Sequence, residues 1–175
     1  MNDNATPLEI RLTQTVTDEQ RQTLFGWGDD IFRARDIRFH CRKSDVHYLG
    51  IVDGQLVSHA GMVKAEVRVA GQPIMVGGIG GVVTVGSAQR KGYAQRMLQQ
   101  ALAYMCETWQ VEFGMLFCLP HVLPFYAGLG WQKIASPISI EQPEGRVPSP
   151  LAAMVIPCAS ECAWPAGPVE LDLPW

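Results

Sequence analysis

The stretch GGIGGVVTVGSAQRKGYAQ, residues 77–95, decides the fold of this chain. Its first half is rich in glycine and β-branched residues, which predicts a strand. A basic turn follows, and apolar residues at helical spacing begin directly after it. The first amides of a helix lack partners within the helix and lie at the positive end of its dipole, and Gly92 lets other groups approach the backbone closely. This order of strand, turn and helix predicts a phosphate site, to which Arg90 and Lys91 add positive charge.

Other phosphate motifs fit this stretch poorly. The sequence has no G-x-x-x-x-G-K-[ST] loop, and the glycines at 77, 78, 80 and 81 do not form a G-x-G-x-x-G that opens a helix. A nucleoside triphosphate or a dinucleotide is therefore disfavoured. Taken alone, the turn is also compatible with a plain surface connection between a strand and a helix.

Composition describes an ordinary globular protein with residues 1–175 in one domain. The chain is 47% hydrophobic and 18% charged, with a net charge of −3, which disfavours a broad nucleic-acid surface. No apolar run is long enough to span a membrane, and residues 1–6 lack the basic and apolar regions of a signal peptide. Five cysteines without C-x-x-C spacing predict reduced thiols in a cytoplasmic protein, although Cys158 and Cys162 are close enough in sequence to oxidise.

Hydrophobic periodicity and turn signals outline the secondary structure. Strand hairpins precede a strand–helix–strand–helix series, which predicts an α/β fold whose sheet is mostly antiparallel with one parallel pair. A polar loop over 141–150 and an irregular tail over 164–175 are expected near the end. The expected strands are 8–12, 46–52, 56–69, 74–85, 111–119, 131–140 and 151–156. The expected helices are one broken helix or two short ones over 18–35, a long one over 89–109 and a short one over 122–129.

Two motifs resemble the GCN5-related N-acetyltransferases over roughly residues 46–131. Residues 89–94, QRKGYA, are similar to the [Q/R]-x-x-G-x-[G/A] acyl-CoA signature, and residues 125–131, FYAGLGW, are similar to the F-Y-x-x-x-G-[FW] block. The resemblance implies a mostly antiparallel central sheet flanked by helices, with splayed strands forming an acyl-CoA cleft. It also implies a core over about 46–136, a substrate-side segment over about 137–175, acetyl-CoA as co-substrate, and no metal.

The same resemblance implies roles for individual residues. The strand backbone at Val82, Val83 and Thr84 faces the pantetheine and the acetyl carbonyl. A second strand splays away at Phe117 and Cys118, and Tyr126 protonates the CoA sulfur. The turn that holds the pyrophosphate consists of Gln89, Arg90, Lys91, Gly92, Tyr93, Ala94 and Gln95.

The general base is left open by the sequence. Many relatives carry a glutamate on the strand where this chain has Gly80 and Gly81. The proton therefore passes to a carboxylate from elsewhere or to water, or the amine binds already neutral. Cys118 with His121 is a weaker alternative, a nucleophile pair, because a thiol in an apolar run is usually inert. The other candidates are His40, His59 and His121, and the acidic residues Asp29, Asp30, Glu170 and Asp172.

A narrower resemblance concerns the acceptor. Ser58-His59-Ala60, the glycine-rich strand and the tryptophan at position 175 are similar to aminoglycoside 2'-N-acetyltransferases. In those enzymes the terminal carboxylate helps to hold the amino sugar, so Trp175 is expected on the substrate side. His121 is a further substrate-side candidate, because it follows the end of the strand with Cys118, where the site should open. The expected activity is acetyl transfer to a primary amine of a small molecule, by direct attack in a ternary complex. A silent acyl-CoA-binding module and an acyltransferase for longer chains are the alternatives, and apolar residues near the C-terminus would allow a homodimer.

Overall fold

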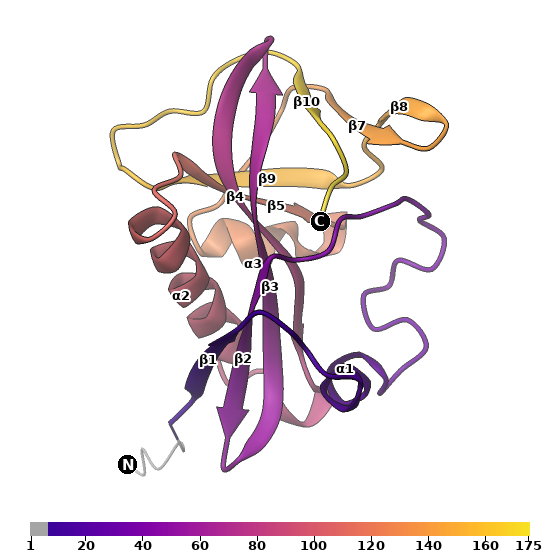
Figure 1. Ribbon diagram of the computed structural model, residues 1–175, viewed down its shortest axis with the longest axis vertical. Helices are drawn as coiled ribbons and strands as arrows, with labels where there is room; N and C mark the ends of the chain where they lie inside the picture. Colours follow the sequence, from indigo (N-terminus) through magenta and orange to yellow (C-terminus); the bar gives the residue numbers. More distant parts are fainter. Residues whose placement is uncertain (1–6) are drawn as a thin grey trace.

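The computed structural model describes residues 7–175. The first six residues, from which the absence of a signal peptide was argued, lie outside the described part. One sheet runs through the molecule, and the long hairpin of β3 and β4 forms its central axis (Figure 1). The strands are β1 (Glu9–Thr13), β2 (Val46–Val52), β3 (Gln55–Val69), β4 (Gln72–Thr84), β5 (Phe113–Cys118), β6 (Gln132–Lys133), β7 (Ile138–Gln142), β8 (Gly145–Pro148), β9 (Ala152–Pro157) and β10 (Val169–Leu171).

The helices cover the two faces of the sheet. The apolar side of α2 (Tyr93–Glu107) packs with α3 (Leu123–Gly128) in the largest core, which includes Met97 and Leu98. On the other face, α1 (Asp18–Phe25) packs through Leu24 against Leu49 and Val83. Two single-turn helices, η1 (Gly86–Ala88) and η2 (Pro120–Val122), precede α2 and α3.

Strand order is β6-β9-β5-β4-β3-β10-β7-β8, with β2 pairing both β1 and β3. The sheet is mostly antiparallel, as predicted. The expectation of one parallel pair is wrong, because both β4–β5 and β10–β7 are parallel. The second pair was missed because β10 lies in the tail that was expected to be irregular, and its partners β3 and β7 are distant in sequence.

Local signals predicted the structure correctly where backbone chemistry decides the conformation. The Asp53-Gly54 hairpin is present, with φ of 51° and 75° at the two turn residues. The first turn of α1 has the predicted capping box, in which the Thr17 hydroxyl accepts from the Gln20 amide.

Several predicted boundaries are wrong for identifiable reasons. The helix expected over 89–109 begins only at Tyr93, because Arg90 and Gly92 have positive φ of 64° and 76°. The helix expected over 18–35 ends at Phe25, with Gly26 as its C-cap. The loop over 141–150 contains the hairpin of β7 and β8, and the strand expected over 131–140 is divided between β6 and β7.

The cysteines also differ from expectation. Cys106, in α2, forms a disulfide with Cys158, just after β9, while Cys41, Cys118 and Cys162 are free. The predicted reduced state is therefore wrong for two of the five cysteines, and Cys162 is not the partner of Cys158. A sequence separation of 52 residues gave no local signal for this pairing.

Candidate functional site at the separation of β4 and β5

A gap opens in the sheet where β4 and β5 part. The two strands pair in parallel from Val76↔Phe113 to Ile79↔Leu116. Beyond that point β5 continues beside β9 to the pair Cys118↔Ala152, while β4 continues beside β3 to the pair Thr84↔Ser58. Within residues 7–175, the edge of β4 from Gly80 to Thr84 therefore has no strand partner on the β5 side.

Side chains of β3 fix the direction of two peptide groups on this edge. The Gly81 carbonyl lies 2.7 Å from His59 Nδ1, and the Val83 carbonyl accepts from the Ser58 hydroxyl at 2.8 Å. Each carbonyl thus points toward β3. Because a trans peptide holds its N–H opposite its C=O, the amides of Val82 and Thr84 point the other way, toward the gap.

A β-bulge marks the start of this edge. The β3–β4 register shifts between His59 and Gly61, and Gly81 has a φ of 58°. That conformation favours glycine, and a Cβ at Gly81 would lie 3.4 Å from His59 Cε1. The backbone conformation at the bulge therefore favours the glycine seen in the sequence.

The predicted phosphate turn lies at the end of the same strand. Gly92 is the N-cap of α2, and no described side chain caps that end of the helix or places an acidic group in its first turn. Nothing described lies within 4 Å of the position that a Gly92 Cβ would take, so the space beside the N-cap is open. Gln89 Nε2 donates to the Thr84 carbonyl at 3.0 Å and ties the turn to the strand. This arrangement fits a diphosphate.

The other residues of the predicted phosphate turn differ in how far their side chains are exposed to solvent. Arg90, Lys91 and Gln95 are exposed, whereas the ring of Tyr93 is buried in the core and leaves only its backbone for a ligand. Ala94 is half-buried.

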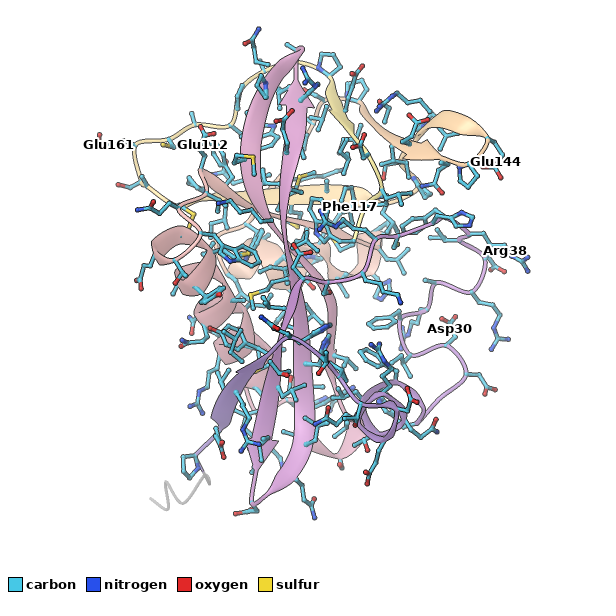
Figure 2. The ribbon with its side chains drawn as sticks, in the orientation of Figure 1. Asp30, Arg38, Glu112, Phe117, Glu144 and Glu161 are labelled. Carbon is cyan, nitrogen blue, oxygen red and sulfur yellow. A yellow bond between two sulfur atoms is a disulfide. The ribbon has the colours of Figure 1, made fainter. Side chains whose placement is uncertain are left out.

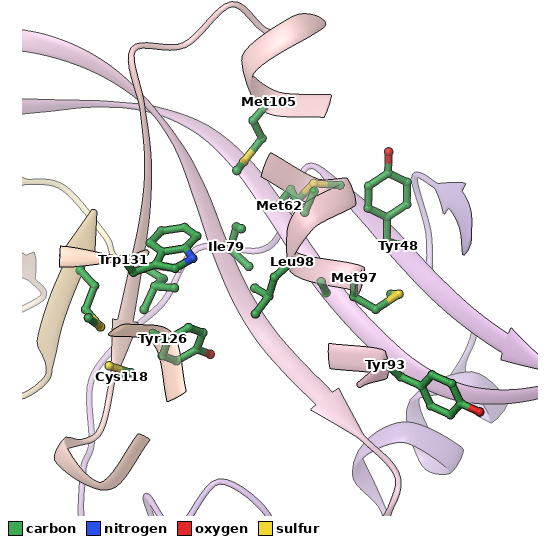
Figure 3. Close-up of a cluster of buried hydrophobic side chains, with 14 of the residues drawn as sticks. Tyr48, Met62, Ile79, Tyr93, Met97, Leu98, Met105, Cys118, Tyr126 and Trp131 are labelled. Atoms are coloured by element: carbon green, nitrogen blue, oxygen red, sulfur yellow. The ribbon is translucent and has the colours of Figure 1, made fainter. Parts of the chain in front are cut away.

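Tyr126 lies across the gap from β4, on α3. Its ring is buried between Phe125 and Trp131, with ring centroids 5.1 and 6.3 Å away, and Figure 3 shows it beside Cys118 with its hydroxyl pointing away from Trp131. Burial raises the pKa of Tyr126 to about 12, so the hydroxyl keeps its proton at neutral pH. Burial also raises the pKa of Cys118 to about 11, which argues against a thiolate nucleophile there.

Trp175 covers the glycines before the bulge. A Cβ at Gly78 would lie 2.1 Å from the Trp175 ring, and a Cβ at Gly80 would lie 2.9 Å from the Trp175 carbonyl carbon. The ring of Trp175 also contacts that of Phe117, with centroids 5.4 Å apart. Position 80 therefore has no room for a glutamate, which explains the departure from the pattern of many relatives.

The remaining candidates for the base are scattered. Figure 2 shows Phe117 near the centre of the molecule and Asp30 far from it, and the Asp30 carboxylate accepts from the amides of Ala34 and Arg35. Residues Asp29, Glu170 and Asp172 are exposed. His121 is exposed in η2, three residues after Cys118.

His40 belongs to the irregular segment before β2. Its backbone N–H donates to the Gln142 side chain and its carbonyl accepts from it, at 2.6 and 3.1 Å. These bonds attach the segment to β7, and the Arg42 amide attaches it to the Pro174 carbonyl at 2.7 Å.

The sequence missed a pair of buried histidines behind the bulge. His47 Nδ1 lies 2.9 Å from His59 Nε2, and both rings are buried, at 8% and 4% exposure. Burial lowers the pKa of both, that of His59 to about 4. The alternation of residues in β2 and β3 places both on the face covered by α1, but their pairing depends on register that the sequence does not give.

The described residues offer neither a metal cluster nor a membrane-spanning helix. Within 7–175 no three histidine, cysteine, aspartate or glutamate side chains gather in a way that would hold a metal ion. No helix in the same range is long and apolar enough to cross a lipid bilayer.

Comparison with known proteins agrees with this geometry. A family model described as an acetyltransferase (GNAT) domain matches residues 14–134. The GNAT family N-acetyltransferase YhbS of Escherichia coli, solved in complex with CoA, has a TM-score of 0.61 and 16% identity over 98% of this chain and 93% of its own. An acyl-CoA N-acyltransferase from Pseudomonas aeruginosa and Escherichia coli ElaA each have a TM-score of 0.56 and 16% identity over 85% of this chain and 99% of theirs.

Structural likeness at this identity shows the fold alone, and a search of curated protein sequences gave no match. The family model, in contrast, covers well over half of the residues. This chain therefore belongs to the GNAT acetyltransferase family and by that membership is an acyltransferase.

Proposed function

We propose that this protein transfers an acetyl group from acetyl-CoA to a primary amine of a small molecule. The observation that carries the proposal is the edge of β4, where the amides of Val82 and Thr84 face the gap left by β5 and lead to the uncapped start of α2. A diphosphate at α2, a pantetheine chain along β4 and a thioester at the bulge would follow one continuous line.

The nucleotide end of the same molecule has a place beyond the turn. A hollow of about 230 Å³ lies between α2 and α3 and is lined by Gln95, Leu98, Gln99, Leu129 and Trp131 among others. Its apolar walls and two amide side chains suit a heteroaromatic base.

Acetyl-CoA supplies the acetyl group as a thioester. In the proposed reaction the amine nitrogen attacks the thioester carbonyl carbon directly, the C–S bond breaks, and the proton of the amine leaves to solvent. The Val82 amide donates to the oxygen as negative charge develops on it. Tyr126, protonated because of its burial, gives its proton to the departing sulfur and regains one from solvent.

The acceptor would bind on the face of the sheet covered by Trp175. Phe117 and Trp175 offer aromatic surface there, and the indole of Trp175 lies directly on Gly78 of β4. Aromatic faces attract ammonium groups, so an amine that carries a second positive charge is a suitable acceptor.

The test combines binding and turnover in one preparation. Calorimetry with acetyl-CoA is followed by CoA release against a panel of small amines that includes aminoglycosides. Chromatography is the better detection method, because the exposed thiols of Cys41 and Cys162 would react with thiol reagents. Absence of acetyl-CoA binding would overturn the proposal, and binding without turnover on any amine would favour a silent CoA-binding module.

Tyr126→Phe tests the assignment of the acid. Its binding of acetyl-CoA should stay unchanged while kcat falls by about 10²-fold or more. Tyr104→Phe is the matched control, because Tyr104 lies on α2 with its ring against Trp109 and is not part of the gap. Full turnover by Tyr126→Phe would remove the acid role but not the proposed reaction.

A further inference from the structure

We infer that His59, locked by His47, is a positioning residue that aims the Val82 amide at the acetyl carbonyl. This inference rests on the proposed function, since it assigns a task to residues behind the reacting groups. The two histidines lie on β2 and β3 and are covered by α1, on the opposite side of β4 from the gap.

The bulge explains why a side chain has this task. Where the register shifts between His59 and Gly61, one peptide of β4 falls out of regular pairing with β3. Gly81 has wide conformational freedom at this position, so its peptide group needs an external constraint. The bond of 2.7 Å between His59 Nδ1 and the Gly81 carbonyl supplies it.

The hydrogen-bond pattern fixes the tautomer of both rings. A carbonyl oxygen only accepts, so His59 Nδ1 must carry the hydrogen. In a neutral ring Nε2 then accepts, and His47 Nδ1 must be its donor at 2.9 Å. Without that donor His59 could move its hydrogen to Nε2, and a nitrogen lone pair would then face the Gly81 carbonyl.

Neighbouring groups hold the same arrangement. Phe25 of α1 meets the His59 ring edge-on, with centroids 5.3 Å apart. Ser58, which is fully buried, fixes the Val83–Thr84 peptide in the same way through the Val83 carbonyl, and its oxygen lies 3.0 Å from the Thr84 hydroxyl. Two consecutive residues of β3 thus orient the two amides that face the gap.

The alternative is that His59 only fills space in the core. Variants of His59 separate this packing role from the positioning role. His59→Asn keeps an N–H near the position of Nδ1 and gives up ring volume, whereas His59→Leu keeps much of the volume and gives up the donor. Leu24→Ala is the matched control: it removes a fully buried side chain that packs on the same face of the sheet, against Leu49 and Val83, and it leaves the hydrogen bond between His59 and the Gly81 carbonyl in place.

The measurements are the dissociation constants of acetyl-CoA and of CoA by calorimetry, and kcat with the best amine of the panel. For His59→Leu, we expect binding of acetyl-CoA to weaken about fivefold relative to CoA and kcat to fall by about 10²-fold. His59→Asn should stay much closer to the wild type in both. Leu24→Ala should lose stability while the ratio of the two constants and kcat stay unchanged.

His47 gives a second, milder test if His59→Leu fails to fold. His47→Phe should release the tautomer of His59 and give a partial loss of kcat, and His47→Asn, which restores a donor near Nδ1, should recover it. Nitrogen-15 NMR of the folded protein reads the tautomer directly, with the hydrogen of His59 expected on Nδ1.

The outcomes separate this inference from the proposed function. A wild type that binds neither CoA nor acetyl-CoA contradicts both. The positioning role alone is overturned if the wild type binds acetyl-CoA and turns over, and His59→Leu keeps both the wild-type kcat and the wild-type ratio of the acetyl-CoA and CoA dissociation constants. That role is also overturned if His59→Asn loses as much as His59→Leu, or if His59 carries its hydrogen on Nε2.

Discussion

Gly78→Ala is predicted to destabilise the protein through one side chain, that of Trp175. The added Cβ would lie 2.1 Å from Cε2, 2.4 Å from Nε1 and 2.5 Å from Cζ2 of the indole. To reach an ordinary contact of about 3.4 Å, the ring must move by about 1.3 Å. Phe117 contacts the same ring, with centroids 5.4 Å apart, so the movement disturbs two aromatic side chains.

The magnitude follows from two opposing effects. Overpacking of this size costs about 1–3 kcal/mol, whereas replacing glycine by alanine in a strand returns about 0.5–1 kcal/mol. Gly78 has no positive φ, so no backbone strain is added. We therefore expect a net loss of about 1–2 kcal/mol from Gly78→Ala in the wild type, and a small gain when Trp175→Ala has already removed the ring.

Urea unfolding followed by far-ultraviolet circular dichroism measures the four members of this cycle, since fluorescence would change with the tryptophan. The coupling free energy between the two positions should be about 2 kcal/mol, with equal m values. Gly128→Ala is the control, because nothing described lies within 4 Å of its Cβ position. If Gly78→Ala has the same effect with and without the indole, the packing of Trp175 on β4 is wrong.

Three further predictions concern the turn, the disulfide and the buried histidine. Gly92→Ala, at a φ of 76° with open space around it, should reduce stability by about 1 kcal/mol in urea unfolding but weaken CoA binding at least tenfold in calorimetry, and unchanged CoA binding would contradict the phosphate turn. Replacing Cys106 and Cys158 by serine should lower the free energy of unfolding by about 2–4 kcal/mol, since the disulfide closes a loop across 52 residues, and equal stability with and without reductant would contradict the bond. Burial lowers the pKa of His59 in the folded protein from 6.5 to about 4. As the pH falls below 6.5, this histidine therefore takes up a proton in the unfolded chain before it does so in the folded protein. The free energy of unfolding should decline between pH 6.5 and pH 4. Urea midpoints across that range should show a weaker decline in His59→Asn, and identical profiles would contradict the shift.

Sequence reasoning was most reliable where the conformation is set by neighbours in the chain. The Asp53-Gly54 turn, the capping box at Thr17 and the order of strand, turn and helix around Gly92 all depend on local backbone chemistry. Boundaries were less reliable, because Arg90 adopts a left-handed conformation that its residue type does not announce.

In the candidate site, too, the features that depend on local sequence were predicted, and those that depend on distant contacts were not. The two motifs pointed to the turn before α2, as a proposed phosphate site, and to Tyr126, but the sequence could not say that Gly80 faces Trp175 or that His59 holds the Gly81 carbonyl. Those contacts join residues 95 and 22 positions apart, and they depend on strand register and on the bulge.

By itself the sequence determined the class of fold, the family motifs and the turn before α2 at which a phosphate site is proposed, because these follow from periodicity, turn chemistry and the free amides at a helix start. Only the tertiary structure decided where β4 and β5 part, which amides face the gap, and how Cys106 meets Cys158. The physical reason is that these features arise from pairing between distant segments, whose register and geometry are fixed by the packed sheet as a whole.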